Sequence, residues 1–270
     1  MAMDGMVAPS MKDKVSPEEW KARVDLAALY RLVAMNGWDD LIYTHISARV
    51  PGPEHHFLIN PYGYLFEEMS ASMMVKVDLD GNLVDKSPYR INAAGFTIHS
   101  AIHNAREDAH FVMHLHTDQG VAVSAQPDGL LPITQHAAIV LRDLAYHDYE
   151  GVALDLDERE RLVADLKEKS AMLLRNHGTL TCGPSAVACY NKMHYLERAC
   201  KMQVMAQVGG VSPIGDNVMG KFTGMRPPAP TGEQPRQATN REAPMMNIMT
   251  DILWPSLLRK LDREMPGYDA

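Results

Sequence analysis

Short apolar runs alternate with longer amphipathic segments along this chain, and this alternation constrains its fold more than any other feature. The apolar run at 111–115 is too short for a helix and is typical of a buried strand. A helical pattern precedes it at 92–105. The same order returns where a buried strand at 171–174 lies between helical segments at 157–169 and 185–208. We therefore predict an α/β fold, with helices packed on a sheet.

The first helix carries a clear start signal. Ser16 suits the N-cap, Pro17 suits the first helical position, and Glu19 completes a capping box. Gly37 is expected to end the helix. Between residues 41 and 87 the pattern shortens to strand-length pieces separated by turn residues, which predicts several short strands.

The 270 residues are enough for one large domain or two small ones, and no internal repeat divides them. We expect a flexible tail at 1–15 and a single domain at 16–210. An appendage at 211–270 should begin as a Pro-rich, weakly ordered arm and end in a C-terminal helix.

Charge and cysteine content exclude several classes of protein. The net charge of −8 disfavours nucleic-acid binding, which normally needs a basic face. No stretch approaches the ~18 apolar residues of a membrane span, and the N-terminus lacks the pattern of an export signal. The three cysteines are odd in number and clustered, which indicates a reducing compartment. We expect a cytoplasmic protein that binds neither nucleic acid nor a membrane.

Three histidines form the strongest candidate site. His114 and His116 lie two residues apart at the end of a strand, so the strand period places both rings on one face. His177 follows the strand at 171–174 and precedes Gly178, which permits a tight turn. Three neutral imidazoles with an open fourth position suit a catalytic zinc, and another divalent ion such as Mn²⁺ would fit the same ligands.

A pair of histidines separated by one residue is by itself a weak signal, because other folds also contain it. His114, His116 and Asp118 begin the pattern of the metallo-β-lactamase superfamily, but Gln119 stands where that pattern needs another histidine. Cupins begin in the same way, yet they consist almost entirely of strands. The predicted helices disfavour a cupin.

Several motifs together resemble the class II aldolase/adducin family, which includes fuculose-, rhamnulose- and ribulose-phosphate aldolases and epimerases. The resemblance runs from about Leu26 to Gly210. It rests on Thr44-His45-Ile46-Ser47, Ile59-Asn60-Pro61-Tyr62-Gly63, the helix before the histidine pair, the pair itself, and Asn176-His177-Gly178. The resemblance implies a three-layer αβα fold with zinc on the three histidines. It also implies a tetramer with active sites between subunits, and a substrate site that includes His45, Ser47, Asn60, Tyr62 and Gly63.

The chain departs from the family at the residues that handle phosphate and protons. Family aldolases carry a catalytic glutamate where this chain has Gly95. Their phosphate-binding segments are Gly-Asn-x-Ser and Thr-Pro-Thr-Gly, and here the bulky His45 and Tyr62 replace small groups. Phosphate needs several converging donors, so these changes favour a small-molecule substrate without phosphate, such as an aromatic one.

Another group must transfer protons if the chain is an enzyme. His136 aligns roughly with a tyrosine acid of the sugar aldolases, and Tyr146 and Tyr149 are further candidates. Each has suitable chemistry, although each is equally compatible with an ordinary packed or interface residue. His99 and His103, one helical turn apart, are expected on a helix surface.

The leading functional hypothesis is a zinc-dependent lyase that cleaves a carbon–carbon bond of a hydroxy-carbonyl substrate. Retro-aldol release of a small aldehyde such as formaldehyde and decarboxylation both leave an anion that a metal stabilises. The alternatives are a sugar-acid epimerase or dehydratase and a non-catalytic, adducin-like interaction module. An intact set of three histidines disfavours the module.

Overall fold

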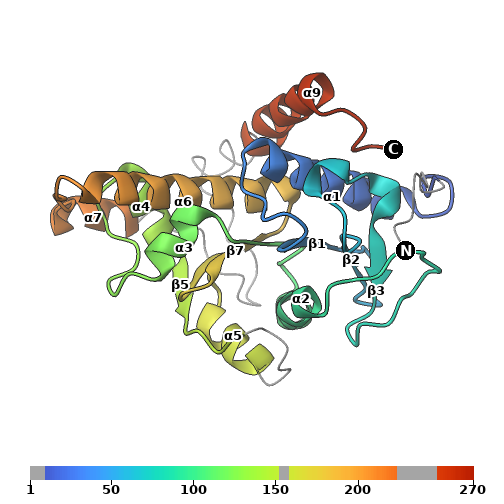
Figure 1. Cartoon of the computed structure of the whole chain (residues 1–270), viewed down its shortest axis with the longest axis horizontal. Coiled ribbons are helices and arrows are strands. Elements are labelled where there is room, and N and C mark those ends of the chain that lie inside the picture. The colour runs from blue at the N-terminus through green and yellow to red at the C-terminus, as the bar shows by residue number, and fades with distance from the viewer. Residues whose placement is uncertain (1–9, 152–157, 224–247) are drawn as a thin grey trace, which may run out of the picture.

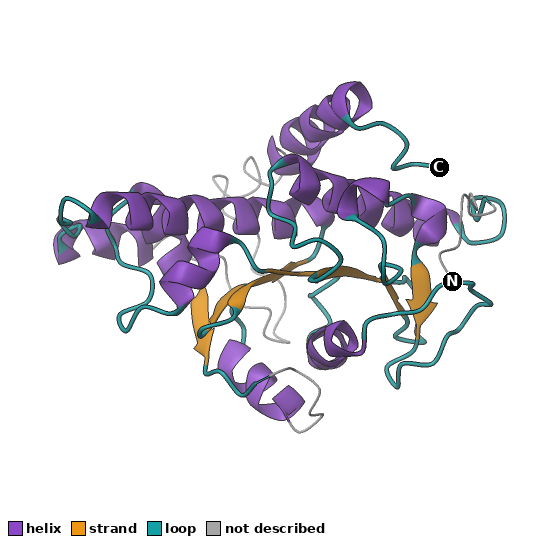
Figure 2. Cartoon of the chain, in the orientation of Figure 1, coloured by secondary structure: helices purple, strands orange, loops and turns teal. Residues whose placement is uncertain are grey.

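The computed structural model describes residues 10–151, 158–223 and 248–270. The strands within these residues form one seven-stranded sheet in the order β3-β2-β1-β4-β7-β6-β5. Helices cover both faces of the sheet, with α1 and α6 on one side and α2 and α5 on the other (Figures 1 and 2). This three-layer arrangement confirms the fold class predicted from the sequence.

The strands of the sheet are β1 (His45–Arg49), β2 (Phe57–Ile59), β3 (Val75–Val77), β4 (Phe111–Leu115), β5 (Leu144–His147), β6 (Ala171–Leu174) and β7 (Gly178–Gly183). The α-helices are α1 (Pro17–Met35), α2 (Ala93–Ala105), α3 (Asp118–Ser124), α4 (Gln135–Leu141), α5 (Glu158–Leu166), α6 (Ala186–Gln207), α7 (Asp216–Thr223) and α9 (Trp254–Glu264). Short 3₁₀ turns η1 (Phe66–Glu68) and η2 (Ala71–Met73) and a π-helical turn η3 (Ile248–Leu253) complete the described elements.

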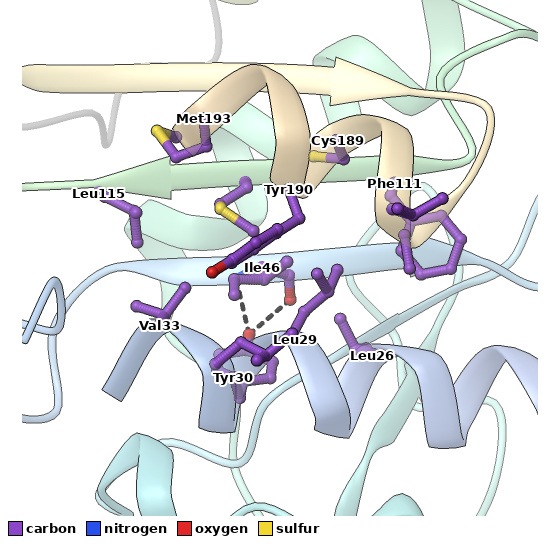
Figure 3. Packing of buried hydrophobic residues seen from close by; sticks show 14 of the residues in the cluster. Leu26, Leu29, Tyr30, Val33, Ile46, Phe111, Leu115, Cys189, Tyr190 and Met193 are labelled. Carbon is purple, nitrogen blue, oxygen red and sulfur yellow. Dashed lines mark hydrogen bonds between the residues drawn. The ribbon is translucent and has the colours of Figure 1, made fainter. Parts of the chain in front are cut away.

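Helix α1 begins as its capping signal predicts. The Ser16 hydroxyl oxygen accepts from the Glu19 amide at 3.1 Å, which satisfies one of the free donors at the helix start. Its buried face packs on the sheet, where the Tyr30 hydroxyl is hydrogen-bonded to both the amide and the carbonyl of Ile46 (Figure 3). This contact fixes β1 against α1 through a fully buried side chain.

The sheet is mainly antiparallel, and only β5 and β6 pair in parallel. The sequence pattern did not predict β7. After β6 the chain turns through 175–177 and returns as β7, which lies between β6 and β4. Polar Thr179 and Thr181 alternate with apolar residues in this strand but are themselves buried, which obscures the usual contrast between faces.

The C-terminal segment packs on the domain. A helix was predicted within 245–263, and the described part of that range contains η3 and all but the last residue of α9, which lies beside α1 (Figure 1). The Ala71 amide donates to the carbonyl of Tyr268 at 2.8 Å, so the chain end is hydrogen-bonded to η2.

Most of the predicted tail and arm, 1–9 and 224–247, lies outside the described residues. Among the described helices, none has the length and apolar character needed to cross a bilayer.

A buried carboxyl group connects α6 to two segments of the sheet. The hydroxyls of Thr117 and Thr179 both donate to the Glu197 carboxylate. Thr117 lies just after β4 and Thr179 lies in β7, so one side chain of α6 holds both strands. Glu197 is 3% exposed, and burial raises the pKa of its carboxyl group to about 7 in spite of these hydrogen bonds.

This raised pKa predicts a specific dependence of stability on pH. Below about pH 4.5 the Glu197 carboxyl is protonated in both the folded and the unfolded state. Between about 4.5 and 7 only the folded state keeps the proton, so the free energy of unfolding falls as pH rises. Relative to a Glu197→Gln variant, the natural protein should lose about 3 kcal/mol between pH 4 and pH 8. Urea unfolding of metal-free protein at several pH values measures this difference.

The exposed Glu160→Gln variant is the matched control and should follow the natural protein at every pH. If the Glu197→Gln and natural curves stay parallel between pH 4 and pH 8, Glu197 keeps an ordinary pKa and the prediction is wrong.

A candidate metal centre and its cavity

His114, His116 and His177 converge where the carboxyl end of the central strand β4 meets the turn between β6 and β7. One ring nitrogen from each lies within 4.8 Å of the other two, and the ring centroids of His114 are 4.8 Å from those of both His116 and His177. His114 belongs to β4 and His116 follows it by one strand period, so both rings lie on the same face, as predicted.

Two of these rings have their tautomers fixed by neighbours. His114 Nδ1 lies 3.0 Å from the carbonyl oxygen of Thr179 and must donate to it. His116 Nδ1 lies 3.0 Å from Oδ2 of Asp40 and donates to that carboxylate. In neutral rings, both Nε2 atoms then carry lone pairs, and they lie 3.0 Å apart. Two lone pairs at that distance repel each other unless a cation lies between them, so the donor set fits a divalent metal.

The pKa values of His114 and His177 are lowered, which favours the neutral form that metal binding requires. Burial lowers the pKa of His114 well below its usual value, and the neighbouring imidazoles of His177 and His116 lower it further. Burial and the nearby His116 lower the pKa of His177 to about 4.

The turn between β6 and β7 carries His177, and the residues on either side of it, Asn176 and Gly178, shape this turn in different ways. Asn176 takes the left-handed conformation with φ 56°, which asparagine tolerates better than most residues. Gly178 was expected to supply that turn, but its φ is not positive. A Cβ at Gly178 would lie 2.4 Å from the carbonyl oxygen of Leu115, so glycine is needed there for the close approach of β4.

A cavity of about 230 Å³ opens beside the three histidines. Its lining residues are Tyr43, Thr44, His45, Asn92, Ile98, His114, His116, Tyr149, Gly151 and His177. No lysine or arginine belongs to this lining among the described residues. Two walls are aromatic, since Tyr43 and Tyr149 both line the cavity and remain about half exposed.

His45 fills the space in which the side chain of residue 95 would otherwise lie. A Cβ at Gly95 would come within 2.5 Å of Cδ2 and 2.7 Å of Cγ of the His45 ring. Such distances exclude any side chain at position 95 while the ring stays in place. The sequence departs from the family pattern at both positions, and the histidine at 45 requires the glycine at 95.

His99 and His103, expected on a helix surface, are instead buried, at 0% and 1% exposure. They form a chain of hydrogen bonds that begins at His45. His45 Nδ1 lies 2.9 Å from His99 Nε2, and His99 Nδ1 contacts the Ser47 hydroxyl. The Ser47 hydroxyl lies 2.7 Å from His103 Nε2, and His103 Nδ1 lies 3.0 Å from the carbonyl oxygen of Ala109. Helix α2 faces β1 here, so these polar groups satisfy one another.

Thr44, just before β1, has an unusual backbone and an unsatisfied side chain. Its φ of 63° is rare for a β-branched residue and costs roughly 1–3 kcal/mol. Its hydroxyl is buried and has no hydrogen-bond partner within the described residues. In a regular strand, Thr44 and His45 would point to opposite faces, and the positive φ allows both to line the cavity.

Of the residues predicted to bind substrate, only His45 lines the cavity directly. Ser47 lies behind it in the hydrogen-bonded chain. Asn60 is buried, and its Oδ1 accepts from the Tyr30 hydroxyl at 2.9 Å. Tyr62 and Gly63 lie in an exposed turn outside the lining.

The predicted proton-transfer residues are distributed differently. The His136 ring packs against Tyr195, with centroids 5.2 Å apart, and does not line the cavity of its own chain. The Tyr146 hydroxyl accepts from the Leu130 amide at 3.0 Å and also lies outside the lining. Tyr149 does line it, 6.1 Å from the His177 ring.

Asp40 and Thr44 were not anticipated. Asp40 contacts His116 across 76 residues of sequence, and neither position carries a local pattern that would reveal it. The unsatisfied Thr44 hydroxyl follows from a backbone angle that the sequence does not display.

Comparison with known proteins agrees with this geometry. A protein of Caulobacter vibrioides, provisionally named an aldolase class 2 protein, is 60% identical over 268 residues, 99% of each chain. Alpha-adducin of Mus musculus is 44% identical over 218 residues, which are 78% of this chain but 30% of the adducin. The crystal structure of an aldolase II superfamily protein from Pseudomonas syringae superposes with a TM-score of 0.84 at 48% identity, covering 97% of this chain and all of the other.

An L-fuculose 1-phosphate aldolase from Glaciozyma antarctica shares the fold at 24% identity, with a TM-score of 0.74 over 97% of this chain and 96% of that one. The Class II Aldolase and Adducin N-terminal domain profile matches residues 24–204, which include the three-histidine cluster and all the lining residues of its cavity. The chain belongs to the class II aldolase/adducin family.

Proposed function

We propose that this protein is a zinc-dependent lyase that cleaves a carbon–carbon bond of an unphosphorylated hydroxy-carbonyl substrate. The observation that carries the proposal is the convergence of His114, His116 and His177 on one point at the wall of a cavity. The reaction is retro-aldol release of a small aldehyde such as formaldehyde, or decarboxylation.

The residues of the cavity support this chemistry in separate ways. A divalent ion on the three histidines would supply a Lewis acid for a carbonyl oxygen of the substrate. Asp40 and the Thr179 carbonyl orient two of the rings so that their Nε2 atoms face the same point. Tyr43 and Tyr149 form flat walls that suit an aromatic or other planar substrate.

The absence of lysine and arginine from the described lining favours a substrate without phosphate. A buried phosphate dianion needs several donors, and an unmet charge would cost several kcal/mol. His45 lines the cavity and so supports an unphosphorylated substrate. Tyr62 is exposed and lies outside the lining, so it does not bear on the choice of substrate.

Tyr149, or a residue of a neighbouring subunit, transfers protons to and from the substrate in the cavity. His136 and Tyr146 lie outside their own chain's cavity, so either acts only across a subunit contact.

We accordingly propose a homotetramer with active sites between subunits. Apolar Met205 and Val208 near the end of α6 are 68% and 93% exposed, and a subunit contact would bury them. The three clustered thiols favour a reducing cytoplasmic location.

A non-catalytic interaction module is the second candidate function. The observation in its favour is the 44% identity to alpha-adducin. A module of that kind has no need of converging ring nitrogens, so metal content and turnover distinguish the two functions. An epimerase or dehydratase on a sugar acid would differ in its products.

The purified protein should contain about one divalent ion per chain, with zinc expected because three imidazoles without a carboxylate favour it. His116→Ala removes a ligand and should lose most of the metal. Asp40→Asn keeps the ligand but weakens its orientation, so metal affinity should fall roughly 10- to 100-fold. Elemental analysis and chelator competition measure both effects.

The exposed His110→Ala variant is the control and should keep its metal. Full metal content in His116→Ala would show that the three histidines do not form the site.

Product analysis tests the reaction itself. Zinc-loaded protein should cleave an unphosphorylated hydroxy-carbonyl compound or an aromatic hydroxy acid, and chelation should abolish turnover because the Lewis acid is removed. Sugar phosphates should be poorer substrates. Faster turnover of a sugar phosphate by a wide margin would contradict the proposed substrate class, and no turnover of any compound would favour the interaction module.

A further inference from the structure

The hydrogen-bonded chain behind the cavity fixes the tautomer of His45. The argument begins at its far end, where His103 Nδ1 lies 3.0 Å from the carbonyl oxygen of Ala109. A carbonyl oxygen only accepts, so His103 must carry its proton on Nδ1. Its Nε2 is then an acceptor, and the Ser47 hydroxyl, 2.7 Å away, must donate to it.

The same reasoning passes along the remaining links. The Ser47 hydroxyl has given its single proton to His103, so it accepts from His99 Nδ1. His99 Nε2 is therefore an acceptor, and His45 Nδ1 donates to it across 2.9 Å. In the neutral ring, His45 Nε2 is left with a lone pair. Within the described residues this nitrogen has no hydrogen-bond partner, and His45 lines the cavity.

Thr44 supplies the complementary group beside it. Its hydroxyl is buried, 2% of the residue is exposed, and no described group is bonded to it. Its own proton is free for donation, and Thr44, in its left-handed backbone conformation, lines the same cavity as His45. An unsatisfied buried hydroxyl is costly, and a ligand hydroxyl that accepts from Thr44 and donates to His45 Nε2 would satisfy both groups.

We propose that Thr44 and His45 form a subsite that binds one hydroxyl group of the substrate, beside the three-histidine cluster. A hydroxyl oxygen accepts from Thr44 while its proton is donated to His45 Nε2. A phosphate or carboxylate oxygen has no proton to donate and faces the His45 lone pair, so the subsite disfavours anionic groups. The position follows from the sheet, since His45 and His114 are directly opposed in the β1–β4 pair and their ring centroids lie 5.2 Å apart.

This inference deepens the proposed function. It rests on that function in one respect, because it requires a metal on the three histidines that binds a neighbouring oxygen of the ligand. The first measurement needs no variant. Two-bond proton–nitrogen spectra of zinc-loaded protein with ¹⁵N-labelled histidine should show His45, His99 and His103 protonated at Nδ1. A proton on Nε2 of His45 in the absence of ligand would overturn the proposal.

The second measurement uses three small probes on zinc-loaded protein by calorimetry. Glycolate has a carboxylate for the metal and a hydroxyl for the subsite, methoxyacetate retains the oxygen but not its proton, and phosphoglycolate replaces the hydroxyl with an anion. Glycolate should bind about 3- to 10-fold more tightly than methoxyacetate, the effect of one neutral hydrogen bond. Phosphoglycolate should bind more weakly still. Equal affinity for glycolate and methoxyacetate, or preference for phosphoglycolate, would overturn the proposal.

Variants separate the two halves of the subsite. Ser47→Ala breaks the chain and releases the His45 tautomer, so the preference for glycolate over methoxyacetate should fall toward 1. Thr44→Val removes the donor that both probes use, so both affinities should fall while their ratio is kept. Ser100→Ala is the matched control, because within the described part of the chain the hydroxyl of this buried α2 serine donates only to the Thr97 carbonyl of its own helix. It should behave as the natural protein, and a Ser47→Ala variant that did the same would contradict the role of the chain.

These outcomes are independent of turnover. Correct tautomers and the expected probe preferences without cleavage of any substrate would support the subsite and reject the lyase. Cleavage with His45 protonated at Nε2 would support the lyase and reject the subsite.

Discussion

Strand β4 is hydrogen-bonded to β1 along one edge and to β7 along the other, and this pairing places His45 and the three-histidine cluster relative to one another. It sets His45 directly opposite His114, and it brings the β6–β7 hairpin that carries His177 against the end of β4. The approach is so close that the Leu115 carbonyl excludes any side chain from Gly178. A shift of one residue in either pair would turn one of the histidines to the opposite face of the sheet. The three-histidine cluster is thus a consequence of strand register.

The departure of this chain from the sugar-phosphate aldolases has a simple steric basis. His45 and a side chain at position 95 compete for the same volume, so His45 is incompatible with the glutamate that the resemblance to sugar-phosphate aldolases implies at that position. The histidine is held from behind by a buried chain of polar groups, and these give it a defined orientation as well as a defined tautomer. A cavity without described lysine or arginine and with aromatic walls agrees with the unphosphorylated, planar substrate that we propose.

Much of this could be predicted from the sequence because the signals are local. The capping residues before α1, the apolar run of β4 and the two-residue spacing of His114 and His116 each depend on neighbouring positions. The resemblance of several short motifs to one family strengthened the assignment of His177 as the third ligand and implied the three-layer fold. Strand β7 was missed because both of its faces are buried, and no local pattern distinguishes its buried Thr179 and Thr181 from solvent-facing residues.

The sequence by itself therefore determined the fold class, the family and the residues able to bind a metal, since residue type and spacing are sufficient for these. Tertiary structure decided which of the remaining residues share the cavity. Asp40 reaches His116 across 76 residues, and His99 and His103 turn inward to Ser47, although their spacing on a helix is equally compatible with an exposed face. Contacts of this kind arise from packing between distant segments. Hydrogen-bond partners, and through them the tautomers that give each nitrogen its role, exist only once the sheet and its helices have assembled.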